Sequence, residues 1–252
     1  MSDALTMSAR SVRLSLRQVD ALITSLLLPV MLMLIFVELF GGAIETGAND
    51  YVTYVVPGVI LLCAGFGSAT TAVSVSQDMT RGIVDRFRSM DVGGAAVLGG
   101  HVAASVVRNV ASTLLVIGVA VALGFRPVAD PLAWLAVAGI LLAFVVAVSW
   151  LAAAIGLLAG SPEAASGFTF FVMFLPYASS AFVPVDTMPS WLQGFAEHQP
   201  VTPVTETLRG LLLGTPVGND PWVALAWCAG ILAVSVAASA ALWGARVRAP
   251  RS

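Results

Sequence analysis

The sequence predicts an all-α integral membrane protein with six transmembrane helices, an N-terminal amphipathic helix, a cytoplasmic helix and an extracellular re-entrant helical hairpin. Its 252 residues are 58% hydrophobic and only 10% charged, with a mean hydropathy of +0.94, whereas soluble domains carry roughly 25% charged residues. The apolar runs are continuous rather than alternating, which favours helices over a β-barrel. Because about six spans with short connections use the whole length, we expect one transmembrane domain over residues 1–252.

The first element is an amphipathic helix within residues 1–20. Arg10, Arg13 and Arg17 fall within about 60° of helical arc, and apolar residues occupy the opposite side. This pattern is typical of a helix lying in the membrane interface. A simple basic flank that orients the first span is the alternative, and the two interpretations are compatible.

Six apolar segments follow, each long enough to cross about 30 Å of hydrocarbon. Two spans begin with a capping residue followed by proline, at Asp130-Pro131 and Ser161-Pro162. Glycines and other small residues around Gly67 and Gly156 predict close helix contacts. Arg108 is expected within the first two turns of the third span, from where it reaches the surface. The expected spans are 21–40, 51–75, 102–125, 132–159, 164–182 and 222–243.

The stretch 77–98 is the one well-charged run between two strongly apolar segments, QDMTRGIVDRFRSMDVGGAAVL. Charges are costly in hydrocarbon, so it belongs at the membrane surface or in water. As a helix it has paired charges on one side and an apolar opposite side of Met79, Ile83, Phe87 and Met90. From the residues alone, two interpretations remain open: a solvated loop between two spans, or a surface helix that binds a partner outside the membrane.

The region 183–220 contains two short helix patterns, one opening near Thr187 and one at Thr202-Pro203, with Gly214 as the stop. Each is too short to span a membrane, and both are apolar enough to enter it. We therefore expect a re-entrant or interfacial hairpin.

Arginine distribution sets the orientation. Six spans place both termini on one side, together with ten of the twelve arginines; Arg126 and Arg209 lie on the other side. By the positive-inside rule both termini and residues 77–98 are cytoplasmic, in the cell membrane, and the hairpin is outside.

Several classes of function are disfavoured. The sequence has no lysine, so it cannot form a P-loop. HExxH and GxSxG motifs are absent, and His101 and His198 fall on opposite sides of the membrane. We expect no catalytic, cofactor-binding or metal-binding residue and no nucleic-acid partner. Cys63 and Cys228 lie in apolar helices and are expected to be buried packing thiols.

Two long segments resemble one known family. The first is Gly82-Ile83-x-Asp85-Arg86-Phe87-Arg88-Ser89-Met90, followed by Ala96-Val97-Leu98 and Arg108-Asn109; the second is residues 179–214, SSAFVPVDTMPSWLQGFAEHQPVTPVTETLRGLLLG. Both are similar to ABC type-2 transporter permeases, and most to the daunorubicin/doxorubicin-resistance (DrrB-type) membrane subunits. One departure is Met90-Asp91, where many relatives have a leucine-proline pair.

The resemblance implies a permease subunit of a multidrug or antibiotic-resistance exporter for amphiphilic drugs, antibiotics or lipid-like molecules. Two such subunits, identical or related, would assemble in the membrane lipid with ABC ATPase subunits that bind ATP and Mg²⁺. Residues 1–20 and the 77–98 coupling helix would face the ATPases, through Arg10, Arg13, Arg17, Gly82, Ile83, Asp85, Arg86, Phe87, Arg88 and Met90.

Aromatic residues of the fifth span are candidates for the substrate path, with lipid contact or core packing as the plainer interpretation. They are Phe168, Phe171, Phe174 and Tyr177. The alternative function is an ion-coupled carrier or channel without an ATPase, which needs a charge at mid-membrane depth; Glu38 and Arg108 are both expected near interfaces. A membrane enzyme is the third class considered.

Overall fold

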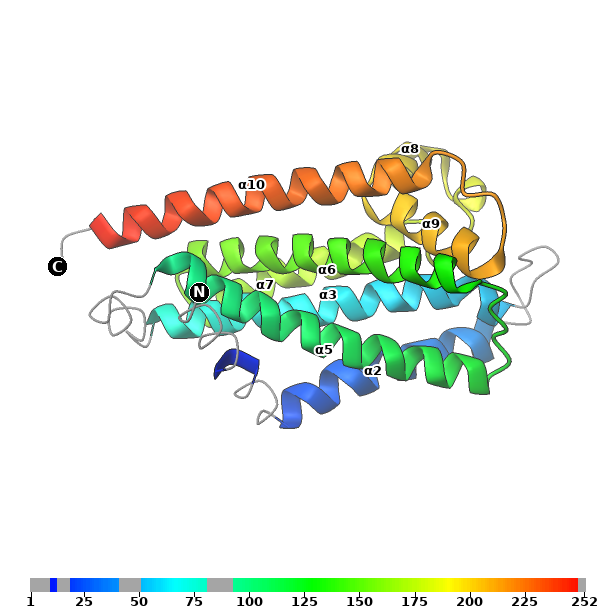
Figure 1. Ribbon diagram of the computed structural model, residues 1–252, viewed down its shortest axis with the longest axis horizontal. Coiled ribbons are helices and arrows are strands. Elements are labelled where there is room, and N and C mark those ends of the chain that lie inside the picture. Colours follow the sequence, from blue (N-terminus) through cyan, green and yellow to red (C-terminus); the bar gives the residue numbers. More distant parts are fainter. Residues whose placement is uncertain (1–9, 13–18, 41–50, 81–92, 249–252) are drawn as a thin grey trace.

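The computed structural model describes residues 10–12, 19–40, 51–80 and 93–248, excepting the side chains of 19–26, 39–40, 168, 169, 171, 173 and 246–248. Within these ranges the regular structure is entirely helical (Figure 1). The helices are α2 (Val19–Phe40), α3 (Tyr51–Thr80), α5 (Gly94–Ala122), α6 (Pro131–Leu158), α7 (Pro162–Phe174), the 3₁₀ turns η1 (Leu175–Ala178) and η2 (Val185–Thr187), α8 (Ser190–His198), α9 (Val201–Leu213) and α10 (Asp220–Arg248).

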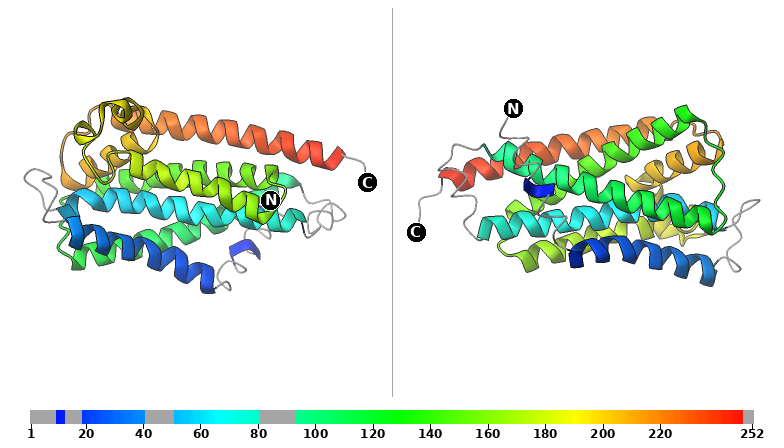
Figure 2. Two further views of the ribbon diagram at one scale, coloured as in Figure 1. Left: turned by 180° about the vertical axis from the view of Figure 1, so that it is seen from behind. Right: turned by 60° about the horizontal axis from the view of Figure 1, so that its bottom comes forward.

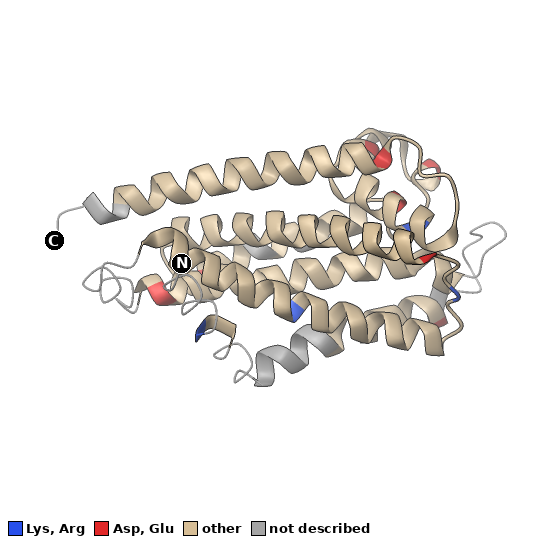
Figure 3. Cartoon of the chain, in the orientation of Figure 1, with Lys and Arg blue, Asp and Glu red and all other residues tan. Residues whose placement is uncertain are grey.

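The long helices run side by side along the long axis of the molecule, and α8 and α9 lie together at one end (Figures 1 and 2). Four of the described helices are long and apolar enough to cross a membrane: Tyr51–Thr80, Gly94–Ala122, Pro131–Leu158 and Asp220–Ala245. Figure 3 shows most charged segments near the two ends, with an almost uncharged middle. The protein is therefore an all-helical, multi-pass membrane protein.

Contacts at the two ends of the helix bundle define the path of the chain. At one end, Val128 N–H donates to Leu212 C=O at 3.0 Å, and Arg209 of α9 reaches the start of α3; we call this the Arg209 end. At the other end, Asp78 of α3 contacts His101 of α5; we call this the Asp78 end. Successive long helices α3, α5 and α6 therefore alternate in direction.

Helix α3 is the centre of the bundle. It contacts α2, α5, α6, α7 and α9, and residues such as Val55, Val59 and Ile60 are at most 1% exposed. An apolar helix without a polar face can be buried by protein or by lipid, and neighbouring helices cover most side chains of α3. The cysteines Cys63 and Cys228 are buried and unbridged, as expected.

Two glycines allow α3 and its neighbours to lie unusually close together. A Cβ on Gly156 of α6 would lie 2.5 Å from Ala72 C=O oxygen, and one on Gly67 of α3 would lie 2.5 Å from Asn109 Oδ1. Both distances are shorter than van der Waals contact. The predicted close contacts at these two glycines are confirmed, whereas Gly160 lies outside α6 with open space around it.

Helix ends follow the sequence signals in most places. The Asp130 side chain accepts from Ala133 N–H at 2.7 Å, Ser161 accepts from Ala164 N–H at 3.2 Å, and Gly214 ends α9 with φ +65°. The main differences are longer helices: α3 continues to Thr80 and α5 begins at Gly94. Residues 77–80 and 94–98 of the charged stretch thus belong to flanking helices, and 81–92 lie outside the described residues.

The fifth expected span is not one uninterrupted α-helix. Helix α7 has 13 residues and gives way to η1, because Pro176 has no N–H with which to continue the helical ladder. Even so, Ala165 packs with Ala72 and Ile155 towards the Asp78 end, while Ser180 meets Arg209 at the opposite end. The segment from α7 to Ser180 therefore runs between the two ends.

The tight contact at Gly156 gives a test of this packing. We expect Gly156→Ala to destabilise the protein by about 1–3 kcal/mol, because the new methyl group meets the α3 backbone. The matched control is Gly139→Ala in the same helix, where nothing lies within 4 Å of the new Cβ. Thermal unfolding in detergent should show a lower midpoint for Gly156→Ala only; equal midpoints would contradict the packing.

Candidate functional site

A cluster of polar side chains is buried where α3, α5 and α6 meet. Ser149 Oγ of α6 donates to Ser105 Oγ of α5 at 2.8 Å and lies 3.2 Å from Ser68 Oγ of α3. All three serines are at most 1% exposed. Hydroxyls in so apolar a bundle need partners, and here three helices provide them for one another. We call this set, together with Gly67, Thr71, Arg108, Asn109 and Ser112, the polar cluster.

Arg108 is the charged member of the polar cluster. Its Nη2 donates to Gly67 C=O at 3.1 Å and to Thr71 Oγ1 at 3.0 Å, and the residue is 8% exposed. It is the middle residue of α5, fourteen residues from Gly94 and fourteen from Ala122. The prediction that it lies in the first two turns and reaches the surface is wrong, because α5 begins eight residues before the expected start at 102.

The spacing of polar residues in α5 predicts this cluster, although the high hydropathy of the helix draws attention away from them. Ser105, Arg108, Asn109 and Ser112 recur at spacings of three and four residues, which places them on one face of α5. Ser112 Oγ donates back to Arg108 C=O at 3.0 Å, and Asn109 Nδ2 donates to Ser105 C=O at 2.9 Å. A polar stripe inside an apolar helix is the pattern of a helix–helix contact in a membrane.

Arg209 organises the other end of the bundle. From α9 its Nη2 donates to Ser180 C=O at 2.8 Å and to Tyr54 C=O at 3.1 Å. Its guanidinium carbon lies 3.8 Å from the centre of the Tyr54 ring, and Nη1 pairs with Glu206. One side chain therefore joins the α8–α9 hairpin, the start of α3 and the segment after η1.

Asp78 joins three segments at the opposite end. Its Oδ2 lies 3.2 Å from His101 Nε2 of α5 and 3.9 Å from Arg10 Nη1 of the N-terminal segment. All three side chains are partly buried. Arg10 lies in the short helical segment 10–12, the only described part of the expected N-terminal helix, and it contacts Asp78 in the last turns of α3.

The other expected coupling residues cannot be placed, because all of them lie outside the described residues: Arg13, Arg17, Gly82, Ile83, Asp85, Arg86, Phe87, Arg88 and Met90. Their role remains a prediction. The described flanks are consistent with a short connection, since Asp78 near the end of α3 and His101 near the start of α5 lie in contact.

Two of the aromatic path candidates lie in one aromatic cluster. Tyr177 stacks on Phe182 with ring centres 5.2 Å apart and lies 6.0 Å from the Phe174 ring. Phe36 of α2 stacks on Phe182 at 4.6 Å. Phe174 and Tyr177 are 53% and 40% exposed, so this cluster is a surface rather than an enclosed channel. The side chains of Phe168 and Phe171 lie outside the described residues.

A continuous helix connects the two charged ends. Tyr54 and Asp78 are both in α3, 24 residues apart, which is about 36 Å of helix. The contacts at Tyr54 and at Asp78 are therefore joined by one continuous and largely buried helix.

Comparison with known proteins gives consistent matches. The family described as ABC-2 type transporter matches residues 3–213. The daunorubicin resistance ABC transporter permease protein DrrB1 of Streptomyces coeruleorubidus is 32% identical over 214 residues, covering 84% of this chain and 76% of that protein. A probable doxorubicin resistance ABC transporter permease protein, DrrC of Mycobacterium tuberculosis, is 27% identical over 222 residues, covering 86% and 79%.

The contacts of Arg209 lead to a prediction. Arg209→Met should destabilise the protein by on the order of 3 kcal/mol, because it removes the bonds to two carbonyls and leaves Glu206 without its partner. Arg126→Met is the matched control, since exposed Arg126 bonds only Val121 and Phe125 carbonyls of its own turn. Thermal unfolding and protease cleavage within 183–220 report the difference; an Arg209→Met protein as stable as the control would refute the assignment.

Proposed function

The chain belongs to the ABC-2 type transporter family, and from this premise we propose how it works as the transmembrane permease subunit of an ABC drug exporter. The match over residues 3–213 carries the conclusion. Relatives named as drug-resistance permeases support the same class of function.

We place six spans in the membrane with both termini in the cytoplasm. Four of the spans are the long apolar helices. The other two are α2, of 22 residues, and the segment from α7 to Ser180, which runs between the two ends. The Asp78 end is cytoplasmic, since it adjoins the arginine-rich stretch and the basic C-terminus. The α8–α9 hairpin with Arg209 is then at the outer face.

ATP hydrolysis belongs to a separate partner. The sequence has no lysine for a P-loop, so ATP and Mg²⁺ bind to ABC ATPase subunits, and a second permease subunit, identical or related, completes the transporter. Residues 1–20 and 77–98 receive the motion of the ATPases. Asp78 supports this, because it ties Arg10 to the bases of α3 and α5.

Coupling follows from α3 as a rod. When ATP closes the ATPase dimer, a push on the Ile83/Phe87/Met90 side of the coupling helix moves the Asp78 end of α3 and α5. The Tyr54–Arg209 contacts carry that movement to the hairpin about 36 Å away. The change requires a state that binds nucleotide more tightly than the resting state does.

The cargo is an apolar or amphiphilic molecule such as an anthracycline drug. The names of the relatives support this class, and the exposed rings of Phe174 and Tyr177, with Tyr177 stacked on buried Phe182, offer aromatic surfaces near the outer end. Release towards the outside completes export.

An ion-coupled carrier is the second candidate, and one observation favours it. Arg108 is a buried charge at the middle of α5, and charges at that depth mark ion paths in many membrane proteins. Its bonds to Gly67 C=O and Thr71 support a role in joining α3 to α5 instead.

A reconstitution separates these functions. The chain is purified from native membranes with its co-purifying ATPase, identified by mass spectrometry, and both are placed in liposomes with daunorubicin. We expect drug transport with ATP and none when the ATPase carries a P-loop Lys→Ala substitution. Transport that survives this substitution and follows a proton gradient would favour the ion-coupled carrier.

Substitutions at Phe87 test whether the apolar side of the coupling helix contacts the ATPase. Phe87→Asp should reduce drug-stimulated ATP hydrolysis at least tenfold, because a charge replaces the apolar contact. Membrane insertion should be unchanged. Phe87→Leu keeps an apolar side chain and should retain most of the stimulation. Equal stimulation in both variants would show that this side does not meet the ATPase.

A further inference from the structure

Trp243 of α10 packs directly on the first residue of α5. A Cβ built on Gly94 would lie 2.4 Å from both Cδ2 and Cε2 of the Trp243 indole, much closer than carbon atoms in contact normally approach. These two atoms form the bond that the two rings of the indole share, so they move only when the whole ring moves. The indole can therefore occupy this place only because residue 94 is glycine.

The contact belongs to an apolar cluster that joins four helices at the Asp78 end. The last turns of α10 and the first turns of α5 lie at this end (Figures 1 and 2). We call the following residues, with Gly94, the Trp243 cluster: Val75 and Met79 of α3, Leu98 of α5, Trp150, Ala153 and Leu157 of α6, and Leu242 and Trp243 of α10. Through this cluster α10 contacts α5, in addition to α6 and α9.

The start of α5 lacks the local stabilisation that other helices have. Asp130 and Ser161 cap α6 and α7 with side-chain hydrogen bonds, whereas the N-cap of α5 is Gly93, which makes none. Glycine is also a weak helix former, and Gly94 follows directly. The first turn of α5 therefore depends on contacts with other helices.

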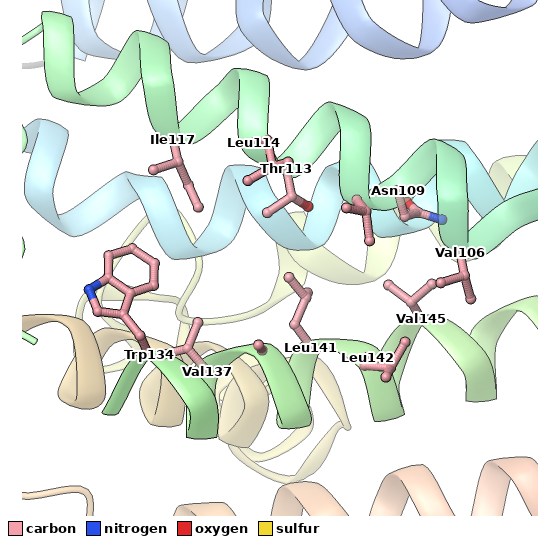
Figure 4. Close-up of a pocket in the computed structure, with 12 residues that line it drawn as sticks. Val106, Asn109, Thr113, Leu114, Ile117, Trp134, Val137, Leu141, Leu142 and Val145 are labelled. Carbon is pink, nitrogen blue, oxygen red and sulfur yellow. The ribbon is translucent and has the colours of Figure 1, made fainter. Parts of the chain in front are cut away.

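Those contacts are apolar, because residues 94–100 carry no polar side chain. Farther along, between Val106 and Ile117, a groove of about 200 Å³ lies between α5 and α6 (Figure 4). On the Asp78 side of this groove the two helices meet closely, since Ser149 donates to Ser105 at 2.8 Å and Leu98 packs with α6. The first two turns of α5 are thus held to the bundle by the Trp243 cluster.

We propose that Trp243 is a positioning residue for coupling, whose indole on Gly94 sets where the 81–92 stretch joins α5 and so presents that stretch to the ATPase. Residue 93 follows residue 92 directly, so a shift of the first turn of α5 moves the end of the stretch with it. The role in coupling rests on the proposed function; the hold on α5 does not. Helix α10 then forms a second connection between the two ends, since Asp220 and Trp243 are 23 residues, or about 35 Å, apart.

An interfacial anchor is the plainer role of a tryptophan near the end of a span. Trp222, at the opposite end of α10, has the properties of such an anchor, because it is 71% exposed. Trp243 differs from it, because it is partly buried and packs on Gly94. Trp222 is therefore the matched control for Trp243.

A double-mutant cycle tests the contact in the permease–ATPase complex. The measured quantity is the ATPase concentration that gives half-maximal drug-stimulated ATP hydrolysis with the permease in liposomes. Gly94→Ala should raise it roughly fivefold, because the new methyl group displaces the indole and the start of α5. In a Trp243→Ala background the same substitution should change it less than about twofold. An equal effect in both backgrounds would overturn the proposal.

Further variants separate positioning from loss of fold. Trp243→Ala alone should also raise the half-maximal ATPase concentration, and Trp243→Phe, which keeps a ring on Gly94, should restore most of the wild-type value. A merely destabilised permease would lower the maximal rate and leave that concentration unchanged; this result for Trp243→Ala would refute the positioning role. Trp222→Ala and Gly99→Ala, where nothing lies within 4 Å of the new Cβ, should have no effect. An equal effect of Trp222→Ala would show that Trp243 is an ordinary anchor.

A spin label tests the hold on α5 in the full chain alone, in lipid nanodiscs without ATPase. The label is attached at Gly93→Cys, an exposed position with open space around it. Trp243→Ala should increase the mobility of the label, and Trp222→Ala should not. Unchanged mobility would overturn the proposal even if the complex exports daunorubicin. A label that responds in a chain without ATP-driven efflux would keep the hold on α5 and contradict the exporter function.

Discussion

The structure depends on the burial of α3. Helices α2, α5, α6, α7 and α9 cover most of its side chains. Close approach comes from small residues, because Gly156 meets the α3 backbone at Ala72 and Gly67 meets Asn109. In lipid, where burial of apolar surface gives helices little reason to associate, such close packing and interhelical hydrogen bonds supply the attraction. A covered α3 can then act as a single rod between two chemically different ends.

Polar groups are placed where they join helices. In the middle of the bundle, α3 is joined to α5 and α6 by the hydroxyls of Ser68, Ser105 and Ser149 and by the guanidinium of Arg108. Arg209 binds α9 to α3 at one end, and Asp78 binds α3 to α5 and the N-terminal segment at the other. Each polar contact includes α3 or leads to it.

The sequence predicted the helical membrane class, the family and most helix ends, because hydropathy, capping residues and glycine stops are local signals. It misplaced Arg108, because the glycine- and alanine-rich residues 94–101 gave no cue that α5 starts eight residues early. It also missed the interruption of the fifth expected span at Pro176. Neither the Arg209–Tyr54 contact nor the neighbourhood of Asn109 could be predicted, since each joins residues on different helices, and no periodicity records which helices become neighbours.

Transmission along α3 is the central claim, and distance measurements between spin labels test it most directly. One pair of labels, at Thr80 and Ala241, reports the Asp78 end, and another, at Leu132 and Glu197, reports the Arg209 end; all four side chains are exposed. With the ATPase bound, ATP should change both distances together. A change confined to the Thr80–Ala241 pair would contradict the account, because the outer hairpin would then be insensitive to events at the ATPase.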